Sequence, residues 1–275
     1  MTQTCSPQLS VFPAGAPVRM ETQGDSVRLR VPAGCEASLC EIYEPQGDAA
    51  YSVQAKLELT LEAGARLTHY KLVQEGFRAV HQSFLEVHAL ASASFESHVF
   101  LFGGAQVRNT IHVRLAGDGA QCSLNGLYVA TGEQAVETHT LIEHLKPHGT
   151  SREFYKGILD QKAQGLFDGL IIVQKEAQKT DSTQTNKNLL LSAQARARSN
   201  PELKILANDV KCKHGSTIGQ LDAEQLFYLR SRGVEKEDAR RLLIYAFASD
   251  MINRVELASL RERIEPIVFA LFQRP

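Results

Sequence analysis

The chain has 275 residues, a formal net charge of −1 and 43% hydrophobic residues. That length supplies enough apolar side chains for one large domain or two smaller ones. The balanced charge offers no basic face, so we expect no nucleic-acid partner. No apolar run is long enough to cross a bilayer and the first residues do not resemble a secretory signal, so we expect no membrane partner and a cytoplasmic location.

Five cysteines are scattered widely along the chain. They are Cys5, Cys35, Cys40, Cys122 and Cys212. An odd number at irregular spacing does not predict a disulfide framework, and without an export signal we expect reduced thiols. No pair has the CxxC spacing of a zinc or cluster site.

Residues 1–45 predict an N-terminal lead-in that is partly irregular, with one strand in SVRLRVPAG at 26–34. Residues 46–221 then alternate apolar and polar side chains in short runs broken by glycine, which is the pattern of β-strands. The clearest runs are LTHYKLV, SFLEVHAL, SFESHVFLF, VRNTIHVRL, CSLNGLYVA, AVETHTLIEH, LFDGLIIVQ and LKILANDVK. The sequence therefore predicts an all-β body.

A weak repeat runs through this body. Ala65, Ala93 and Ala120 each precede a strand, at steps of 28 and 27 residues. A near-regular period favours a stacked β repeat such as a β-helix. A β-sandwich would give a similar number of strands, so the pattern leaves both architectures open.

The character of the chain changes at residue 222. Asp222 with Gln225 three residues later predicts a helix start, and Gly233 a helix end. The next segment and a final one bent at Pro266 also have helical spacing, so residues 222–275 predict a C-terminal helical domain. Its apolar face must be buried against the body, which is the commoner outcome, or against a partner. The face consists of Ala239, Leu242, Leu243, Ala246, Phe247 and Met251.

Three histidines in HTLIEHLKPH suggest a metal site, but strand alternation points His139 and His144 to opposite faces. The chain has no HExxH motif and no phosphate-binding loop. The stretch AQKTDSTQTNKNLLLS at 177–192 is dense in amides and hydroxyls, and that composition predicts a polar loop or a solvated strand edge.

Cys212 and His214 lie two residues apart and so share one face of an extended segment. A thiolate and an imidazole are suitable ligands for iron, zinc or a cluster. Two ligands are too few for a stable site, so another chain would have to complete it. The alternative is a buried cysteine and a hydrogen-bonded histidine at a sheet end, and spacing alone favours it.

Several long blocks, in order, resemble the SufB/SufD family of iron–sulfur cluster assembly proteins, over roughly residues 50–255. These blocks are AQKTDSTQTNKNLLLS, PELKILANDVKCKHGSTIGQLD and LFYLRSRG. Within the family, KCKHG followed by TIGQLD is most similar to the SufD branch. Family members often carry a longer N-terminal helical region, which this chain largely lacks.

The resemblance implies a mainly β fold, with a right-handed parallel β-helix core and a small C-terminal α-helical domain. It implies a non-catalytic scaffold that pairs with SufB and docks the SufC ATPase through the C-terminal helices. Exposed β-helix ends also make a homodimer plausible when the partner is absent.

The family position for cluster assembly at the SufB–SufD interface matches His214, and Cys212 matches a neighbouring family cysteine. The resemblance therefore implies a transient iron–sulfur cluster, shared with the partner, and no stably bound cofactor. Flavin has been associated with the assembled complex, but no residue pattern here indicates a flavin pocket. For SufC docking we predict Arg240, Leu243, Phe247 and Met251.

A different class of function is an alternative: a carbohydrate-active β-helix enzyme, either a lyase or a hydrolase. Such an enzyme needs carboxylates that converge on a groove along the stack. The candidates are Glu137, Glu143, Asp168 and Asp181, and no paired spacing singles them out.

Overall fold

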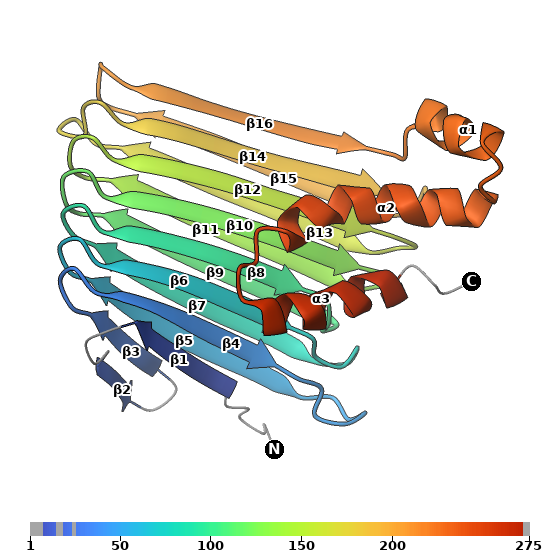
Figure 1. Cartoon of the computed structure of the whole chain (residues 1–275), viewed down its shortest axis with the longest axis horizontal. Helices are drawn as coiled ribbons and strands as arrows, with labels where there is room; N and C mark the ends of the chain where they lie inside the picture. Colours follow the sequence, from blue (N-terminus) through green and yellow to red (C-terminus); the bar gives the residue numbers. More distant parts are fainter. Residues whose placement is uncertain (1–7, 15–18, 24–25, 272–275) are drawn as a thin grey trace.

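The computed structural model describes residues 8–14, 19–23 and 26–271. They form a mainly β protein, a β-solenoid of about seven turns followed by helices (Figure 1). We call one of the two sheets the covered sheet, because two of the helices lie over its outer face. It contains β1 (Gln8–Ala14), β4 (Glu36–Tyr43), β6 (Arg66–Val73), β8 (Ser94–Leu101), β10 (Gln121–Ala130), β12 (Thr150–Leu159), β14 (Asp181–Leu190) and β16 (Lys211–Gly219), in that order. We call the other sheet the open sheet, because its outer face is partly exposed. It contains β2 (Arg19–Gln23), β3 (Ser26–Val31), β5 (Ser52–Leu61), β7 (Val80–Ala89), β9 (Gln106–Leu115), β11 (Ala135–His144), β13 (Gln164–Val173) and β15 (Arg196–Ile205). The helices are α1 (Ala223–Ser231), α2 (Lys236–Ile252) and α3 (Ala258–Leu271).

From β3 onward, consecutive strands alternate between the two sheets, so each coil adds one strand to each sheet. From β3 onward all neighbouring strands pair in parallel, whereas β1 pairs antiparallel with β4 and β2 with β3. Ala65, Ala93 and Ala120 are fully buried and stack at the coil corners, where Ser94 N donates to Ala65 O. The predicted β repeat is therefore confirmed as a solenoid and not a sandwich.

The solenoid begins earlier than the predicted domain boundary at residue 46. Strands β3 and β4 already pair in parallel with β5 and β6, and β3 confirms the strand predicted in SVRLRVPAG. The rest of the predicted lead-in is described only in part, and Cys5 lies outside the described residues. At the other end, the Asp222 side chain accepts hydrogen bonds from the backbone of Glu224 and Gln225, so α1 starts at the predicted cap.

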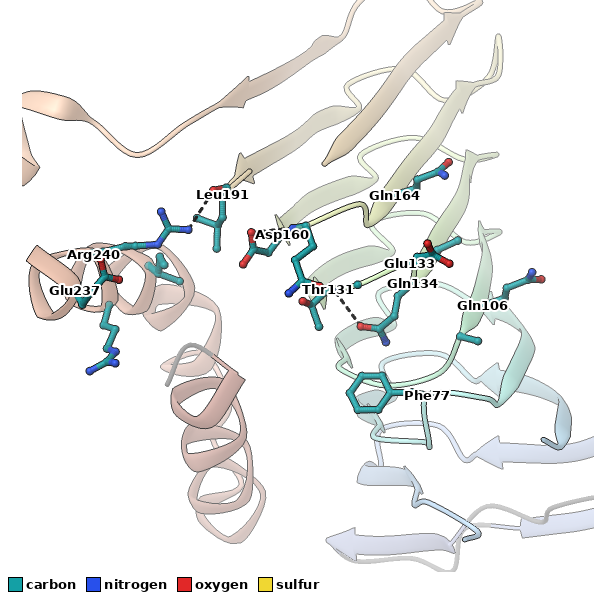
Figure 2. Close-up of a pocket in the computed structure, with 16 residues that line it drawn as sticks. Phe77, Gln106, Thr131, Glu133, Gln134, Asp160, Gln164, Leu191, Glu237 and Arg240 are labelled. Atoms are coloured by element: carbon teal, nitrogen blue, oxygen red, sulfur yellow. Dashed lines mark hydrogen bonds between the residues drawn. The ribbon is translucent and has the colours of Figure 1, made fainter. Parts of the chain in front are cut away.

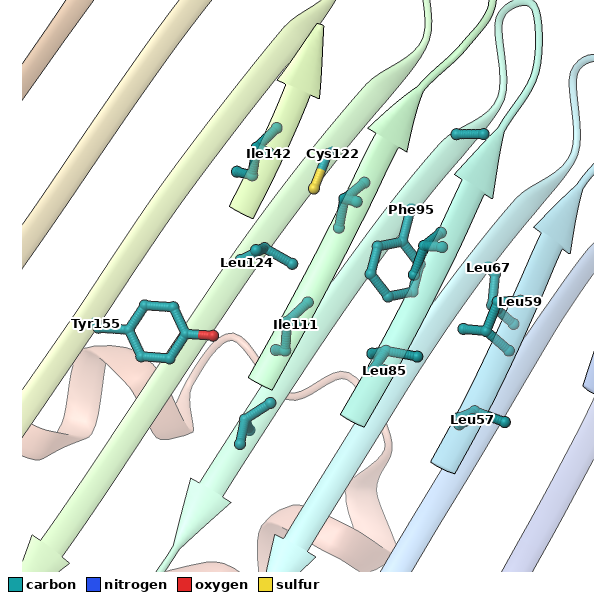
Figure 3. Close-up of a cluster of buried hydrophobic side chains, with 14 of the residues drawn as sticks. Leu57, Leu59, Leu67, Leu85, Phe95, Ile111, Cys122, Leu124, Ile142 and Tyr155 are labelled. Atoms are coloured by element: carbon teal, nitrogen blue, oxygen red, sulfur yellow. The ribbon is translucent and has the colours of Figure 1, made fainter. Parts of the chain in front are cut away.

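The main core lies between the two sheets. Figure 3 shows Leu59, Leu85 and Ile111 of the open sheet facing Leu67 and Phe95 of the covered sheet. The outer face of the open sheet is partly exposed, as the strict alternation of buried and half-buried residues along β11 shows. Alternating strands of this kind bury one face only.

A second core lies on the outer face of the covered sheet, which α2 and α3 cross (Figure 1). Leu72, Phe100 and Ile158 point outward from their strands and contact buried helical residues such as Ile244 and Met251. The apolar side of α2 is therefore largely buried against the body of the chain. None of the helices in the described ranges is both long and apolar enough to span a membrane.

The interior of the first coils holds a network of charged side chains. Glu41 Oε2 accepts a hydrogen bond from the Tyr43 hydroxyl, Glu41 Oε1 is 2.7 Å from Nε2 of His69, and Lys71 is also buried. Burial alone would raise the pKa of Glu41, but the Lys71 charge and the hydrogen bonds outweigh it and hold that pKa at about 2. The buried charges are thus compensated within the solenoid.

Candidate functional site at the open end of the solenoid

The last coil leaves one end of the solenoid uncovered in the described part of the chain. β16 pairs with β14 on one edge, and β15 pairs with β13 on one edge. We call β15 and β16 the open end; Figure 1 shows β16 at the margin of the covered sheet, beyond all other strands. The free edge of β16 presents unpaired backbone N–H and C=O groups, which can pair with a strand from another chain.

The open end carries Cys212 and His214. In register, Cys212 pairs with Ser182 and His214 with Gln184, and both partners on β14 are fully buried. Because paired residues in a parallel sheet point the same way, Cys212 and His214 both belong to the inner face of the solenoid, as alternation predicts. Cys212 is half-buried against the main core, while His214 is exposed.

The two side chains differ in their chemistry. Burial raises the pKa of the Cys212 thiol above its ordinary value, although a hydrogen bond with the Ser182 backbone opposes the shift. Cys212 is therefore mainly a protonated thiol at neutral pH and a poor metal ligand without help. The His214 imidazole is accessible, so it is the better ligand of the two in this chain.

Two ladders of buried polar side chains lie beneath these residues. Under Cys212, Ser182 Oγ is 2.7 Å from Ser151 Oγ, and Ser151 Oγ is 2.9 Å from His144 Nε2. Burial lowers the pKa of His144 to about 4, so this ring is neutral at physiological pH. Under His214, Gln184 Nε2 donates to Glu153 Oε2 at 2.7 Å. The interior is therefore polar where it approaches the open end.

Glu153 should make the fold less stable as pH rises. Burial raises its pKa from 4.5 to about 7, with the Gln184 hydrogen bond opposing. The unfolded chain loses this proton near pH 4.5 and the folded chain keeps it to about 7, so stability falls across that window. Glu153→Gln keeps an acceptor for Gln184 and removes the penalty, on the order of 3 kcal/mol at pH 8. Thermal melts from pH 4 to 8 should show a gain for the variant that grows with pH; equal curves at all pH values would contradict this assignment.

This polar interior is the part of the site that sequence patterns missed. The stretch 177–192 is not a polar loop or a solvated edge, because Ser182, Gln184, Asn186 and Asn188 are all buried on the inner face of β14. Their spacing of two residues is the signal of a strand face, but polar side chains on such a face ordinarily indicate solvent.

The residues predicted for docking of an ATPase do not share one environment. Met251 is buried in the second core, and Phe247 is half-buried with its ring 4.6 Å from Lys156 Nζ. Arg240 donates to the Leu191 carbonyl at 3.1 Å and faces a pocket of about 1160 Å³ between α2 and the coil corners (Figure 2). Only Leu243 lines a surface groove formed by the helices themselves.

That groove lies between α1 and α2 and has a volume of about 1020 Å³. Beside Leu243 it is lined by Phe227, Tyr228 and Leu242, whose side chains are 74%, 57% and 50% exposed. Three large exposed apolar residues on two adjoining helices are more than scattered surface residues. The predicted apolar face is therefore only partly right: Ala239 and Met251 are buried, but Leu242 and Ala246 are exposed. The other buried residues of α2 are Ile244, Ala248 and Ile252.

The four carboxylates proposed for a carbohydrate-active enzyme do not converge on a groove. Glu137 pairs with Arg108 and shares His139 with Asp168, whereas Glu143 pairs with His112 and Asp181 with Arg152. Burial alone would raise the pKa values of Glu137 and Glu143, but hydrogen bonds from their partners outweigh it and lower both. A general acid needs the opposite shift, so the enzymatic alternative is not favoured.

The histidines of HTLIEHLKPH behave as strand alternation predicts. His139 is half-exposed beside Glu137, whereas His144 is fully buried. Across the described residues, no group of three or more His, Cys, Asp or Glu side chains could hold a metal ion. The four described cysteines, Cys35, Cys40, Cys122 and Cys212, are free thiols. A metal or cluster at the open end would therefore need ligands from another chain.

Comparison with known proteins identifies the family. Residues 16–247 match the family model described as "SUF system FeS cluster assembly, SufBD core domain". The chain is therefore a member of a class of iron–sulfur cluster assembly proteins, and it belongs to the SufBD family.

Among its relatives, the iron–sulfur cluster assembly protein SufD of Escherichia coli is 36% identical over 231 residues, covering 84% of this chain and 55% of the relative. The SufBD family protein slr0076 of Synechocystis is 35% identical over 77% of this chain and 47% of the relative. The chloroplastic protein ABCI7 of Arabidopsis thaliana is 31% identical, with shares of 89% and 52%. The chain thus spans about half the length of the curated relatives it matches.

Proposed function

We propose that this chain is a SufD-type scaffold subunit, without catalytic activity of its own, and that a nascent iron–sulfur cluster is assembled where its open end meets a SufB-type partner. The observation that carries the proposal is the exposure of His214 on the free-edged strand β16, on the inner face of the solenoid. We expect the assembly to take place in the cytoplasm, where a reduced thiol such as Cys212 persists.

The geometry of the open end supports pairing with a second chain. The free edge of β16 has backbone groups that a strand of the partner can complete, as in β-augmentation. The partner then brings its own ligands to His214, which alone cannot hold a cluster. An imidazole in place of a thiolate raises the potential of a cluster, and we infer that it eases transfer of the cluster as cargo. In the absence of the partner, the same edge favours a homodimer.

For the second partner, a SufC-type ATPase, we propose docking at the groove between α1 and α2. The chain has no phosphate-binding loop of its own, so ATP hydrolysis would be supplied from outside. Phe227, Tyr228 and Leu242 give the groove the exposed apolar anchors that helix-to-groove contacts use.

A pair of variants separates docking from folding. Leu242→Asp should abolish co-purification with the ATPase while leaving the melting temperature within a few degrees of wild type, because Leu242 is half-exposed. Phe247→Asp should instead lower the melting temperature, because that side chain packs beside Lys156 and Phe154. Affinity capture and thermal melts of both variants provide the measurement. Undiminished capture of the ATPase by folded Leu242→Asp would contradict docking at this groove.

The function itself is tested by anaerobic reconstitution with the SufB-type and SufC-type partners. Iron and acid-labile sulfide are measured per complex, with and without this chain and with ATP present. We expect clusters to accumulate only when all three proteins are present. Equal yields with and without this chain would overturn the proposal.

A further inference from the structure

The carbonyl of the Gln184 side chain is buried and lacks a hydrogen-bond partner within the described part of the chain. Gln184 is fully buried, its Nε2 donates to Glu153 Oε2 at 2.7 Å, and its Oε1 has no hydrogen-bond partner among the residues that the structure describes. A buried acceptor without a partner costs roughly as much as a lost hydrogen bond. This one therefore calls for a donor that approaches it in some state of the protein.

The local packing restricts where that donor can come from. A Cβ added at Gly169 would lie 2.4 Å from Gln184 Nε2, so the missing side chain at Gly169 makes room for the amide. With Nε2 held toward Glu153 on β12, the amide geometry turns Oε1 away from β12. The neighbouring strand on the side away from β12 is β16.

The residue of β16 in register with Gln184 is His214. Neighbouring strands lie about 4.8 Å apart, which is within reach of a ring that rotates about its side-chain bonds. The His214 ring is exposed, and no hydrogen bond or ion pair links it to another residue in the ranges that the structure describes. The unpaired acceptor and the unpaired donor therefore occupy adjacent positions.

We propose that Gln184 is the positioning residue for His214: its side-chain carbonyl accepts the imidazole N–H and leaves the other ring nitrogen with a free lone pair for iron. The binding of iron by the free ring nitrogen rests on the proposed function, whereas the contact between Gln184 and His214 does not. Histidines that bind metals generally donate their second N–H to a carbonyl or carboxylate, which fixes tautomer and orientation. Glu153 would act one step further away, by holding the amide in place.

Ring ¹⁵N spectra of the isolated full chain, labelled at histidine, test the contact directly. The His214 signals are assigned by their loss in His214→Ala, at a pH of about 8.5 where an ordinary imidazole is neutral. In the wild type one tautomer should dominate. Gln184→Met preserves the volume and removes the acceptor, so the tautomer ratio should move about five-fold toward the free-histidine mixture.

Two further variants keep the test decisive. Gln184→Asn retracts the carbonyl by one carbon and should shift the ratio as Gln184→Met does, which guards against poor folding of the methionine variant. Thr183→Val changes the outward face of the same strand and should leave the ratio unchanged. A wild-type ratio in the two Gln184 variants would overturn the proposal. Because neither partner nor cluster is present, this outcome is independent of whether the proposed function holds.

Discussion

A complex carrying His214→Ala should contain at least about ten-fold less iron and acid-labile sulfide than the wild-type complex after anaerobic reconstitution. The reason is geometric: within the proposed site, His214 is the accessible ligand that this chain offers on the inner face of β16. Outer-shell residues alone typically change metal affinity by about 10–100-fold, and loss of a direct ligand should cost no less. The variant should still fold and bind its partners, since the side chain is exposed.

Two controls accompany this prediction. Lys213→Ala alters the adjacent exposed residue on the opposite face of β16 and should leave the cluster content unchanged. Cys212→Ser tests the half-buried neighbour, whose raised thiol pKa predicts a smaller loss than that of His214→Ala. Full cluster content in His214→Ala would remove His214 from the mechanism.

Lys71→Met should lower the free energy of unfolding by about 3–5 kcal/mol. Lys71 is 3% exposed, and its charge interacts with Glu41 and Glu75 inside the first coils. Its Nζ also donates to Asn109 Oδ1 at 3.3 Å. Removing the ammonium leaves buried carboxylates without their counter-ion, which costs more than the pair itself contributes. Urea or thermal unfolding of the purified chain measures the loss.

The double variant Lys71→Met with Glu41→Gln provides the matched control, because it removes both charges and should regain part of the stability. The pKa of Glu41 is depressed from 4.5 to about 2 in the folded state, so its contribution is complete above pH 4.5 and disappears as pH falls toward 2. The gap between Lys71→Met and wild type should therefore narrow in acid. A single variant as stable as wild type at pH 7 would contradict the proposed compensation.

The sequence was informative about the solenoid because its periods are local. Strand alternation and the 28- and 27-residue steps between Ala65, Ala93 and Ala120 anticipate the stacked coils. The same local signals did not reveal that β3 and β4 belong to the stack. β3 has only six residues, and the turn after it and the turn after β4 each contain a proline and a glycine, so the period is not visible there.

The helical segment shows a different limit. Helical spacing identifies an apolar face but does not say what covers it, since packing against a sheet and against a partner leave the same pattern. Met251 is buried by the body of the chain, whereas Leu243 lines a surface groove. The direction in which α2 crosses the covered sheet decides which of its residues are buried and which are exposed, and tertiary packing sets that direction.

At the open end, spacing placed Cys212 and His214 on one face, and the register agrees. Spacing did not reveal Gln184 or Glu153, which lie about 30 and 60 residues before His214. These residues come close to His214 only because successive coils stack with their strands in register. Polar residues on an inward strand face also contradict the usual hydrophobic pattern. Such departures from the pattern are expected at functional sites.

The most direct test of the central claim is a pulsed electron paramagnetic resonance measurement on the reduced, cluster-loaded complex in which only this chain carries ¹⁵N-histidine. Our account predicts a ¹⁵N coupling to the cluster from this chain, absent when the labelled chain carries His214→Ala and retained in Lys213→Ala. A loaded complex with no ¹⁵N coupling, or with a coupling that survives His214→Ala, would contradict it.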